Sequence, residues 1–246
     1  MSDMVDLSGR VALVTGGSRG IGRAIALALA GAGADVAVNY RERADEAEAV
    51  AVAIRDLGRK ALALRADVSQ SAAVAKLVAA VGRALGPVDV LVNNAGVALR
   101  RGVDELTEAD FDRTIAVNLK SAFLCTQAVW PGMRARGWGR IVNISSGAAR
   151  GAGIVGPHYN ASKAGMEGLT RGYAARLVKD GVTVNAVAPS LIESDMTAGH
   201  RAESAARIPL GRLGTPEEVA AVVLMLAGNA YMTGQTVQVN GGLHFS

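Results

Sequence analysis

The sequence contains little cysteine, histidine or aromatic residue, and each scarcity excludes a kind of site. Its 246 residues include a single cysteine, Cys125, so no disulfide can form within the chain, and a reducing compartment is expected. Cys125 lies in an apolar helical stretch, which favours a place in the core over a role as nucleophile. An aromatic content of 4 % beside 50 % hydrophobic residues predicts an aliphatic core. The histidines show no metal-ligand spacing, so no metal site is expected; they are His158, His200 and His244.

Long hydrophobic runs and a strong charge of one sign are also missing. No apolar run approaches the roughly 18 residues of a membrane span, so no membrane association is expected. Residues 1–6 lack the basic and apolar regions of a secretory signal, and we expect a cytoplasmic protein. The formal net charge of +4 is too small and too dispersed to indicate nucleic-acid binding, but it is compatible with anionic ligands.

The most informative residues that are present are Tyr159 and Lys163, four positions apart. On a helix such a pair shares one face and can meet at one substrate. A phenol titrates near pH ~10, and a nearby cation lowers its pKa, so the pair is typical of a proton donor tuned by its own charge. A surface tyrosine beside a solvated lysine is the alternative, and the surrounding sequence decides between them.

Two further features favour the catalytic interpretation. Ser146 follows the apolar run 140–144, which has the length and β-branched content of a buried strand. Ligands bind at the carboxyl ends of such strands in open α/β sheets. Near the start of the chain, the glycine-rich stretch 15–22 lies between the strand-like run 11–14 and a helical run. Glycines in that setting let the backbone approach a pyrophosphate, and the free N–H groups of the helix face the anion.

Strand-like and helix-like runs alternate along the chain. This alternation, with strands that are continuous apolar runs, predicts an α/β fold with a doubly wound parallel sheet of about seven strands and helices on both faces. No linker, repeat or low-complexity tract divides residues 1–246, so a single domain is expected. The expected strands are 11–14, 35–39, 60–66, 88–93, 140–144, 183–188 and 236–239, and the expected helices include 21–32, 45–57, 72–85, 108–130, 158–179 and 216–226.

The segment 190–214 interrupts the alternation because it has no strand pattern. A segment of that length after the carboxyl end of a strand is more typical of a substrate lid than of a plain connection. A structural cover that does not move is the alternative.

The end of the second expected strand indicates which cofactor is bound. A carboxylate there accepts hydrogen bonds from the ribose 2′-hydroxyl of NAD, whereas the 2′-phosphate of NADP favours arginine. The strand ends at Asn39 and Arg41 follows closely, with Arg19 of the glycine motif as a second arm for a phosphate. Asp35 lies at the opposite end of the strand, while Glu42 is close enough to leave NAD open. We therefore expect NADP(H).

These motifs occur in the order and spacing of a known family. The chain resembles a short-chain dehydrogenase/reductase from about residue 7 to residue 242, and it resembles most closely the 3-oxoacyl-(acyl-carrier-protein) reductase branch. The resemblance is carried by the glycine motif 15–22, Asp67-Val68, Asn93-Asn94-Ala95-Gly96, Asn118, Ser146, the pair Tyr159 and Lys163, the stretch 185–189 and the tail 233–242.

The resemblance implies a Rossmann-type fold and an enzyme that transfers a hydride between NADP(H) and a carbonyl or secondary alcohol. It implies that Tyr159 exchanges the proton with the carbonyl oxygen and that Ser146 stabilises that oxygen. Lys163 would hold down the phenol pKa and bond the nicotinamide ribose, and Asn118 would hold a water that relays protons. The cofactor-binding residues that it implies are Gly16, Ser18, Arg19, Gly20, Ile21, Gly22, Arg41, Asp67, Val68, Asn94, Ala95, Gly96, Tyr159, Lys163, Ile192 and Ser194.

The resemblance also implies a homotetramer that pairs through the helices near 108–130 and 158–179, and a role in fatty acid biosynthesis. Two departures from the family pattern bear on the substrate. Ser190 stands where the family usually has glycine, and a positive φ there would be strained. Asp180 stands near the basic surface by which the relatives bind an acidic acyl carrier protein, although one exposed charge is worth ~1 kcal/mol or less.

The substrate itself is left open by the sequence. Arg100 and Arg101 follow the Asn-Ala-Gly turn, where they could contact an anionic substrate or merely solvate a loop. A 3-oxoacyl thioester is the expected substrate, and a small ketone, a polyol or a sugar is the alternative. A nucleotide-sensing protein without catalysis is a remote third reading, because such a protein is free to lose the catalytic residues and all of them are present.

Overall fold

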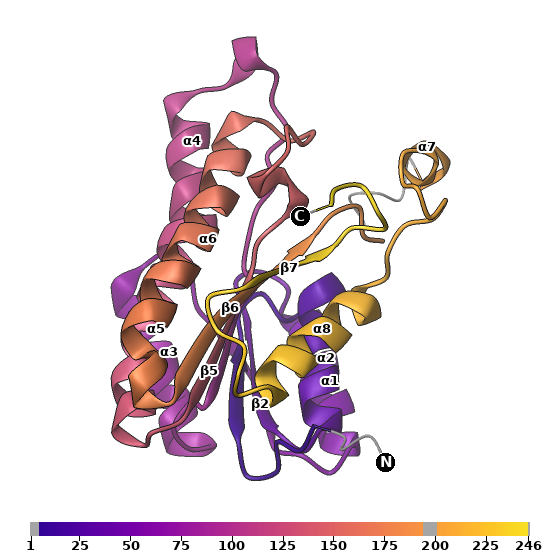
Figure 1. Cartoon of the computed structure of the whole chain (residues 1–246). Helices are drawn as coiled ribbons and strands as arrows, with labels where there is room; N and C mark the ends of the chain where they lie inside the picture. The colour runs from indigo at the N-terminus through magenta and orange to yellow at the C-terminus, as the bar shows by residue number, and fades with distance from the viewer. Residues whose placement is uncertain (1–4, 194–200, 246) are drawn as a thin grey trace.

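The sheet at the centre of the molecule has seven parallel strands. The computed structural model describes residues 5–193 and 201–245, and Figure 1 shows how they are arranged. The strand order is β3-β2-β1-β4-β5-β6-β7, and every neighbouring pair is parallel. The strands are β1 (Val11–Val14), β2 (Asp35–Tyr40), β3 (Ala61–Arg65), β4 (Val90–Asn93), β5 (Gly139–Ile144), β6 (Val182–Pro189) and β7 (Thr236–Val239). The α/β doubly wound fold is therefore confirmed.

Helices cover both faces of this sheet (Figure 1). One layer packs beside β1 and β2 and consists of α1 (Gly20–Gly31), α2 (Ala44–Asp56) and α8 (Pro216–Gly228). The opposite layer consists of α3 (Ser71–Ala84), α4 (Glu108–Ile115), α5 (Ser121–Ala135) and α6 (Pro157–Leu177). None of the helices in the described ranges is long and apolar enough to cross a membrane.

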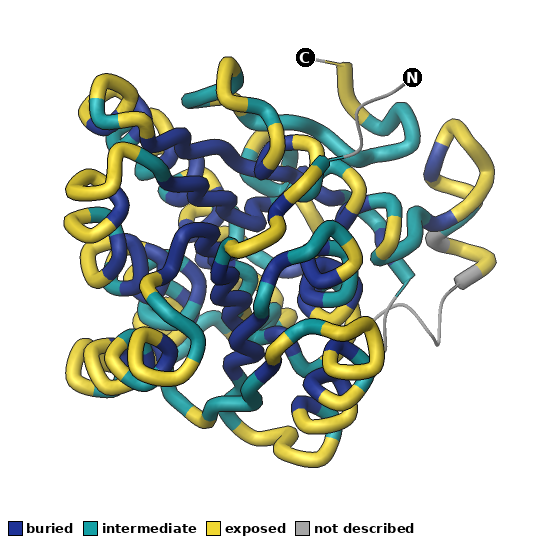
Figure 2. Tube along the Cα trace, turned by 90° about the horizontal axis from the view of Figure 1, so that it is seen from below, coloured by how far each residue is buried: buried dark blue, intermediate teal, exposed yellow. Residues whose placement is uncertain are grey.

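Aliphatic side chains fill the space between sheet and helices, as the composition predicts. The central strands are buried and the outer helix faces are exposed (Figure 2). Cys125 is fully buried on α5, and burial raises the pKa of its thiol to about 12. A thiol that stays protonated at neutral pH is a poor nucleophile, so Cys125 is part of the core.

The expected helix over 108–130 is helical throughout, but its middle turn is not α-helical. A π-helical turn, Ala116–Lys120, separates α4 from α5, and α5 continues to Ala135. The side chain of Asn118 leaves this turn toward the strand-end loops instead of solvent and is fully buried. π-Turns of this kind are frequent at functional sites.

The segment 190–214 contains more regular structure than the sequence suggests. It begins with a bridge between Ile192 and Gly214 and includes the short helix α7, Arg201–Ala206. Residues 194–200, which form the middle of the expected lid, lie outside the described residues. Lid closure therefore stays a prediction.

Candidate active site

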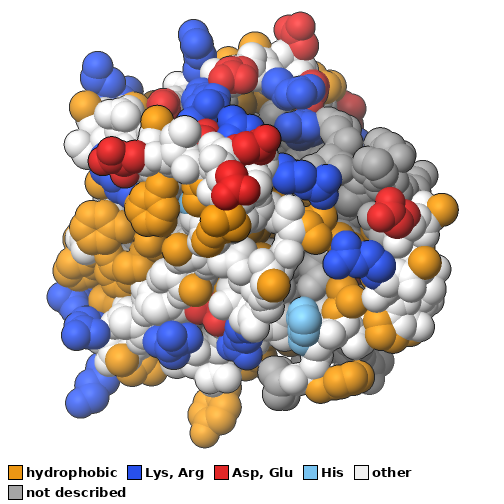
Figure 3. Space-filling model, turned by 90° about the horizontal axis from the view of Figure 1, so that it is seen from above, with side chains coloured by type: hydrophobic (Ala, Val, Ile, Leu, Met, Phe, Trp, Pro, Cys, Tyr) orange, Lys and Arg blue, Asp and Glu red, His pale blue; other side chains and the backbone are white. Residues whose placement is uncertain are grey.

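The candidate site lies at the carboxyl edge of the sheet, where the strand order reverses between β1 and β4. Such a switch point is where open α/β sheets bind their ligands. Loops from β1, β4 and β5 meet there, and the amino-terminal half of α6 lies alongside. Figure 3 looks onto this end and shows Lys and Arg side chains spread over it with acidic ones among them, which suits an anionic ligand.

Ser146 and Tyr159 meet at this edge. Ser146 lies two residues after the end of β5 and begins the short 3-10 turn η3, Gly147–Ala149, by accepting a hydrogen bond from Ala148 N at 3.2 Å. It also lies close enough to the phenol of Tyr159, in the first turn of α6, to lower the pKa of that phenol. The two hydroxyls that the sequence pairs are thus brought together.

The expectation that Lys163 lowers the phenol pKa is not met. Burial raises the pKa of Tyr159 above its ordinary value, and the hydrogen bond from Ser146 offsets part of that rise. The Lys163 ammonium lies 5.7 Å from the centre of the Tyr159 ring and donates to Ile144 O at 2.7 Å. A phenol with a raised pKa is fully protonated at neutral pH, which is the form that donates a proton to a carbonyl.

Lys163 is itself strongly affected by its surroundings. Only 4 % of the residue is exposed, and burial lowers the pKa of its amino group to about 8. Its one protein hydrogen-bond acceptor among the described residues is Ile144 O, so its remaining N–H groups are available to a ligand.

Asn118 joins the same cluster from the π-turn. Its amide oxygen accepts from Val97 N at 2.8 Å, and its amide nitrogen donates to Val97 O at 3.0 Å and to Ser162 Oγ at 3.1 Å. A Cβ built on Gly96 would lie 3.3 Å from Asn118 Oδ1 and 3.7 Å from Lys163 Nζ. Asn118, Gly96 and Lys163 are therefore neighbours, and the Asn118 side chain fastens the loop after β4 to α6.

The glycine motif forms a cradle whose shape leaves no room for a side chain at Gly16 or Gly22. Gly16 has a positive φ of 61°, and a Cβ there would lie 3.0 Å from Ala95 Cα. A Cβ on Gly22 would lie 2.3 Å from Gly16 O. Helix α1 begins directly afterwards, and the side chain of its first flanking residue does not cap it within the part of the chain that the structure describes. Free N–H groups at a helix start beside a glycine-rich turn fit a pyrophosphate.

Thr15 and Asn94 fasten this cradle to the loop after β4. Thr15 Oγ1 accepts from Asn94 N and Ala95 N, both at 3.0 Å, and donates to Val92 O. Asn94 Nδ2 in turn donates to Thr15 O at 3.0 Å and Gly16 O at 2.9 Å. Thr15 was not among the expected site residues, although its place at the carboxyl end of β1 is the signal that could have identified it.

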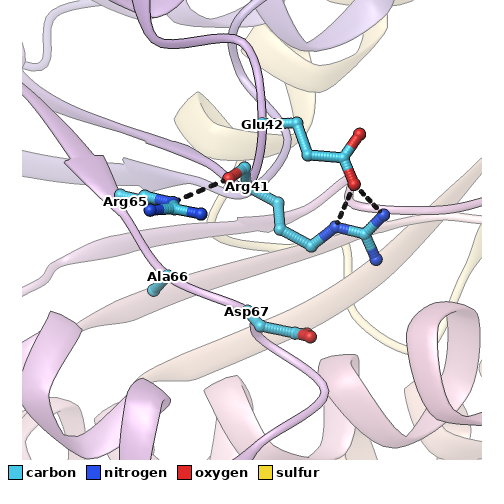
Figure 4. Close-up of a pocket in the computed structure, with 5 residues that line it drawn as sticks. All are labelled: Arg41, Glu42, Arg65, Ala66 and Asp67. Carbon is cyan, nitrogen blue, oxygen red and sulfur yellow. Dashed lines mark hydrogen bonds and ion pairs between the residues drawn. The ribbon is translucent and has the colours of Figure 1, made fainter.

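A cavity of about 470 Å³ opens at the ends of β2 and β3 (Figure 4). Arg41 is held there by Glu42, to which its Nε donates at 3.0 Å. Asp67 faces the cavity, and the hydrogen bond from Ser69 lowers its pKa. The lining residues are Arg41, Glu42, Arg65, Ala66 and Asp67. Arg65 is a second basic residue of this cavity, the expected role of Arg19 stays a prediction, and Val68 is buried in the core.

Arg65 is the last residue of β3 and pairs in register with Tyr40 of β2. This register places Arg65 beside Arg41, which follows Tyr40 and lines the cavity. Its Nε donates to Arg41 O at 3.1 Å. Asn39, buried at the end of β2, donates to Leu64 O and Ala66 O and accepts from Gly16 N at 3.4 Å. Asn39 thereby links the cavity to the glycine cradle, a role that the sequence did not reveal.

The remaining expected cofactor residues lie around this groove. Ser18 and Ile21 are half-buried in the turn that enters α1, and Arg19 and Gly20 are exposed there. Ile192 is buried and follows β6, while Ser194 lies outside the described residues.

Ser190 causes no backbone strain. Within 5–193 and 201–245, glycine is the only residue type with a positive φ, so Ser190 does not need the left-handed conformation. Its N–H donates to Val239 O at 3.0 Å, and its hydroxyl packs against Gly147, where a Cβ would lie 2.4 Å away. Ser190 thus touches the turn that carries Ser146.

His158 and Arg101 fix the loops at the mouth of the site. His158 is fully buried, and its Nε2 donates to Leu99 O at 2.9 Å. Arg101 binds Asp110 at 3.1 Å, so its charge is largely committed to the start of α4. His158 therefore serves the fold beside Tyr159. In the described ranges no group of three or more His, Cys, Asp or Glu side chains could hold a metal ion.

The fold and the cluster of Ser146, Tyr159 and Lys163 beside a phosphate cradle define a nucleotide-binding oxidoreductase. A family model described as enoyl-(acyl carrier protein) reductase matches residues 16–244. The chain belongs to the short-chain dehydrogenase/reductase family, whose members use a nicotinamide cofactor.

Curated relatives support the same assignment over nearly the full chain. The chain is 42 % identical to nodulation protein G of Azospirillum brasilense, over 97 % of this chain and 100 % of that one. It is 42 % identical to the 3-oxoacyl-(acyl-carrier-protein) reductase FabG of Pseudomonas aeruginosa, over 98 % and 100 %. It is 39 % identical to an acetoacetyl-CoA reductase of Allochromatium vinosum, over 95 % and 98 %.

Solved structures agree on the fold but differ in name. A putative short-chain alcohol dehydrogenase from Sinorhizobium meliloti 1021 superposes with a TM-score of 0.92 at 38 % identity, over 98 % of both chains. A putative gluconate dehydrogenase from Agrobacterium tumefaciens superposes with a TM-score of 0.91 at 35 % identity, over 98 % of both chains.

Proposed function

We propose that this protein reduces the ketone of a 3-oxoacyl thioester or a similar ketone with NADPH. The observation that carries the proposal is the convergence of Ser146, Tyr159 and Lys163 at the switch point of the sheet. A bound nicotinamide supplies the hydride in such a reaction. Each of the three side chains then has one task.

Tyr159 donates its phenolic proton to the carbonyl oxygen of the substrate, and its raised pKa keeps that proton in place at neutral pH. Ser146 donates a hydrogen bond to the same oxygen, where negative charge develops. Lys163 presents its free N–H groups to the ribose of the cofactor. Asn118 holds the loop around Gly96 beside Lys163 and keeps these groups in place.

The cavity at the ends of β2 and β3 is the proposed site of the adenosine ribose and its 2′-phosphate. Two guanidinium groups, of Arg41 and Arg65, suit a phosphate dianion. Glu42 should weaken the binding of such a dianion, because its carboxylate is already paired with the Arg41 guanidinium. NADPH must therefore displace Glu42 from Arg41, while NADH need not.

This arrangement predicts opposite results for two adjacent variants. Arg41→Ala removes a charge-assisted bond and should weaken NADPH binding about 10- to 100-fold with little effect on NADH. Glu42→Gln frees Arg41 and should strengthen NADPH binding about three- to fivefold, as expected for an exposed ion pair. Fluorescence titration of both cofactors with each variant measures these ratios. Equal losses for NADPH and NADH in Arg41→Ala would contradict the phosphate role.

The acyl group of the substrate is proposed to arrive on coenzyme A or another small thioester, with an acyl carrier protein as the less favoured partner. Arg134 at the end of α5 donates to Asp180 at 2.7 Å, so a basic residue that could meet an acidic carrier is already neutralised. Two of the curated relatives are named acetoacetyl-CoA reductase, and others are named 3-oxoacyl-(acyl-carrier-protein) reductase. A polyol or sugar dehydrogenase is the second candidate, because a structural neighbour is named a gluconate dehydrogenase.

The test is stopped-flow oxidation of NADPH against a panel of 3-oxoacyl thioesters, diketones and sugars. We expect the highest rate with 3-oxoacyl-CoA. We expect the carrier-bound thioester to react no faster than the CoA thioester. Faster turnover of a sugar or polyol with NADP would establish the second candidate instead.

We also propose a cytoplasmic homotetramer, as the family resemblance implies, and the relatives named 3-oxoacyl-(acyl-carrier-protein) reductase favour a place in fatty acid biosynthesis. Phe123 of α5 is 41 % exposed and Phe111 of α4 is 44 % exposed, so this helix layer offers apolar surface to a second copy. Size-exclusion chromatography with light scattering measures the mass.

A further inference from the structure

Glu167 is a buried carboxylate that the proposed reaction does not use. It lies on α6 one turn beyond Lys163 and two turns beyond Tyr159, so the three side chains share one face of the helix. Only 4 % of Glu167 is exposed. Buried carboxylates are rare in proteins and are found with partners.

The partners of Glu167 come from both sides of Ser146. Its Oε2 accepts from Arg150 Nε at 3.1 Å, and its Oε1 lies 3.4 Å from Ser145 Oγ. The single hydroxyl proton of Ser145 is shared between this carboxylate and Lys163 O, which lies 3.2 Å away. Ser145 immediately precedes Ser146. Arg150 closes the turn that Ser146 opens, because Arg150 N donates to Gly147 O at 3.2 Å. One carboxylate on α6 therefore holds both ends of the turn that carries Ser146.

We propose that Glu167 is a positioning residue, which uses Arg150 and Ser145 to hold Ser146 against Tyr159. The inference rests on the proposed function, since it assumes that these two hydroxyls act on one carbonyl oxygen. Ser146 belongs to the turn after β5, whereas Tyr159 belongs to α6. Glu167 of α6 contacts Ser145 and Arg150, which flank the turn, and so links the helix to the turn. A displacement of a catalytic group by about 1 Å can reduce turnover 100-fold, so such a contact affects rate as well as stability.

The decisive variant is the double substitution Arg150→Met with Glu167→Met. Glu167 is buried whereas the Arg150 side chain is 43 % exposed, and replacing both partners by apolar side chains leaves no buried carboxylate without its cation. We expect the double variant to melt near the wild-type temperature and to bind NADPH within about twofold of it. We nevertheless expect kcat for the best ketone to fall about tenfold or more with KM little changed, because the turn is no longer held. The single variant Glu167→Asp, which keeps the carboxylate, should have a kcat between that of the double variant and that of wild type.

A second readout does not depend on the substrate. With ¹³C-labelled tyrosine, the Tyr159 ring carbon that bears the hydroxyl reports whether Ser146 still donates to it, and the spectrum of Tyr159→Phe assigns its resonance among the four tyrosines. The double variant should shift this resonance in the same direction as Ser146→Ala. The matched control, Glu48→Met with Arg55→Met, removes a surface pair on α2 and should leave both kcat and the resonance unchanged.

The outcomes separate the two proposals. A double variant with wild-type kcat and an unmoved Tyr159 resonance overturns the positioning role, because the pair then serves the fold alone. A fall in kcat no greater than in the control pair also overturns it. If the wild type reduces none of the ketones, the proposed function fails, and the shift of the resonance still decides whether Glu167 positions Ser146.

Discussion

Replacing Tyr159 by phenylalanine should reduce kcat for ketone reduction by about 10²- to 10⁴-fold, the range that proton transfer by a positioned side chain contributes. The variant keeps the ring, which is packed at the start of α6, and loses only the hydroxyl that meets Ser146. NADPH affinity should change less than about threefold, because the cradle around Gly16 and the Arg41 cavity are untouched. Stopped-flow reduction and cofactor titration on the same sample measure both quantities.

Tyr173→Phe is the matched control for this prediction. Its hydroxyl accepts from Gln127 at 2.8 Å on the outer side of α6 and lies away from the site, so turnover should stay within about twofold of wild type. Retention of a tenth or more of the wild-type kcat in Tyr159→Phe would show that another group delivers the proton.

The raised pKa of Tyr159 also predicts how turnover depends on pH. Reduction uses the protonated phenol, which burial favours, so reductive turnover should hold up to alkaline pH. Oxidation of an alcohol by the reverse path needs the phenolate, so oxidative turnover should rise with pH over the same range. The sequence alone suggested the opposite environment, because it placed the ammonium of Lys163 nearby but could not show that the phenol is buried.

The strands were predictable because each one is a short continuous run of buried aliphatic residues. The run Ala-Leu-Val of β1 and the run Ile-Val-Asn-Ile of β5 can be covered by helices on both faces only in a parallel sheet. The π-turn between α4 and α5 was not predictable in the same way. Its Asn118 contacts Val97 and Ser162, which come from other parts of the sequence.

The residues of the candidate site also fall into a group that the sequence predicted and a group that it did not. Residues that touch a ligand directly, such as Tyr159 or the glycines of the cradle, belong to local motifs whose spacing is visible in the sequence. Residues that hold those groups in place do not. Thr15, Asn39 and Glu167 act through partners that are 23 or more positions away or on a different element, and only the folded chain brings them together.

Replacing Lys163 by methionine should remove most turnover while leaving the protein at least as stable at neutral pH. Burial lowers the pKa of the Lys163 amino group from 10.5 to about 8, so holding it charged in the folded state at pH 7 costs ~3 kcal/mol. Methionine has a similar length and no charge, and it loses the bond to Ile144 O, worth about 1–3 kcal/mol. The expected change in melting temperature is between zero and an increase of about 8 °C. Turnover should fall because no cation remains for the ribose beside Tyr159.

The stability difference between wild type and Lys163→Met should depend on pH in one direction. Between pH 8 and 10.5 the unfolded chain keeps the Lys163 proton that the folded chain has released, and this proton release makes folding easier as pH rises. Below about pH 8 both states carry the proton and the full burial penalty applies. The free energy of unfolding of wild type, measured with urea, should therefore increase relative to that of Lys163→Met between pH 7 and pH 10. Parallel curves over that range would show that Lys163 is not a desolvated ammonium, and the proposed presentation of a buried cation to the cofactor would then fail.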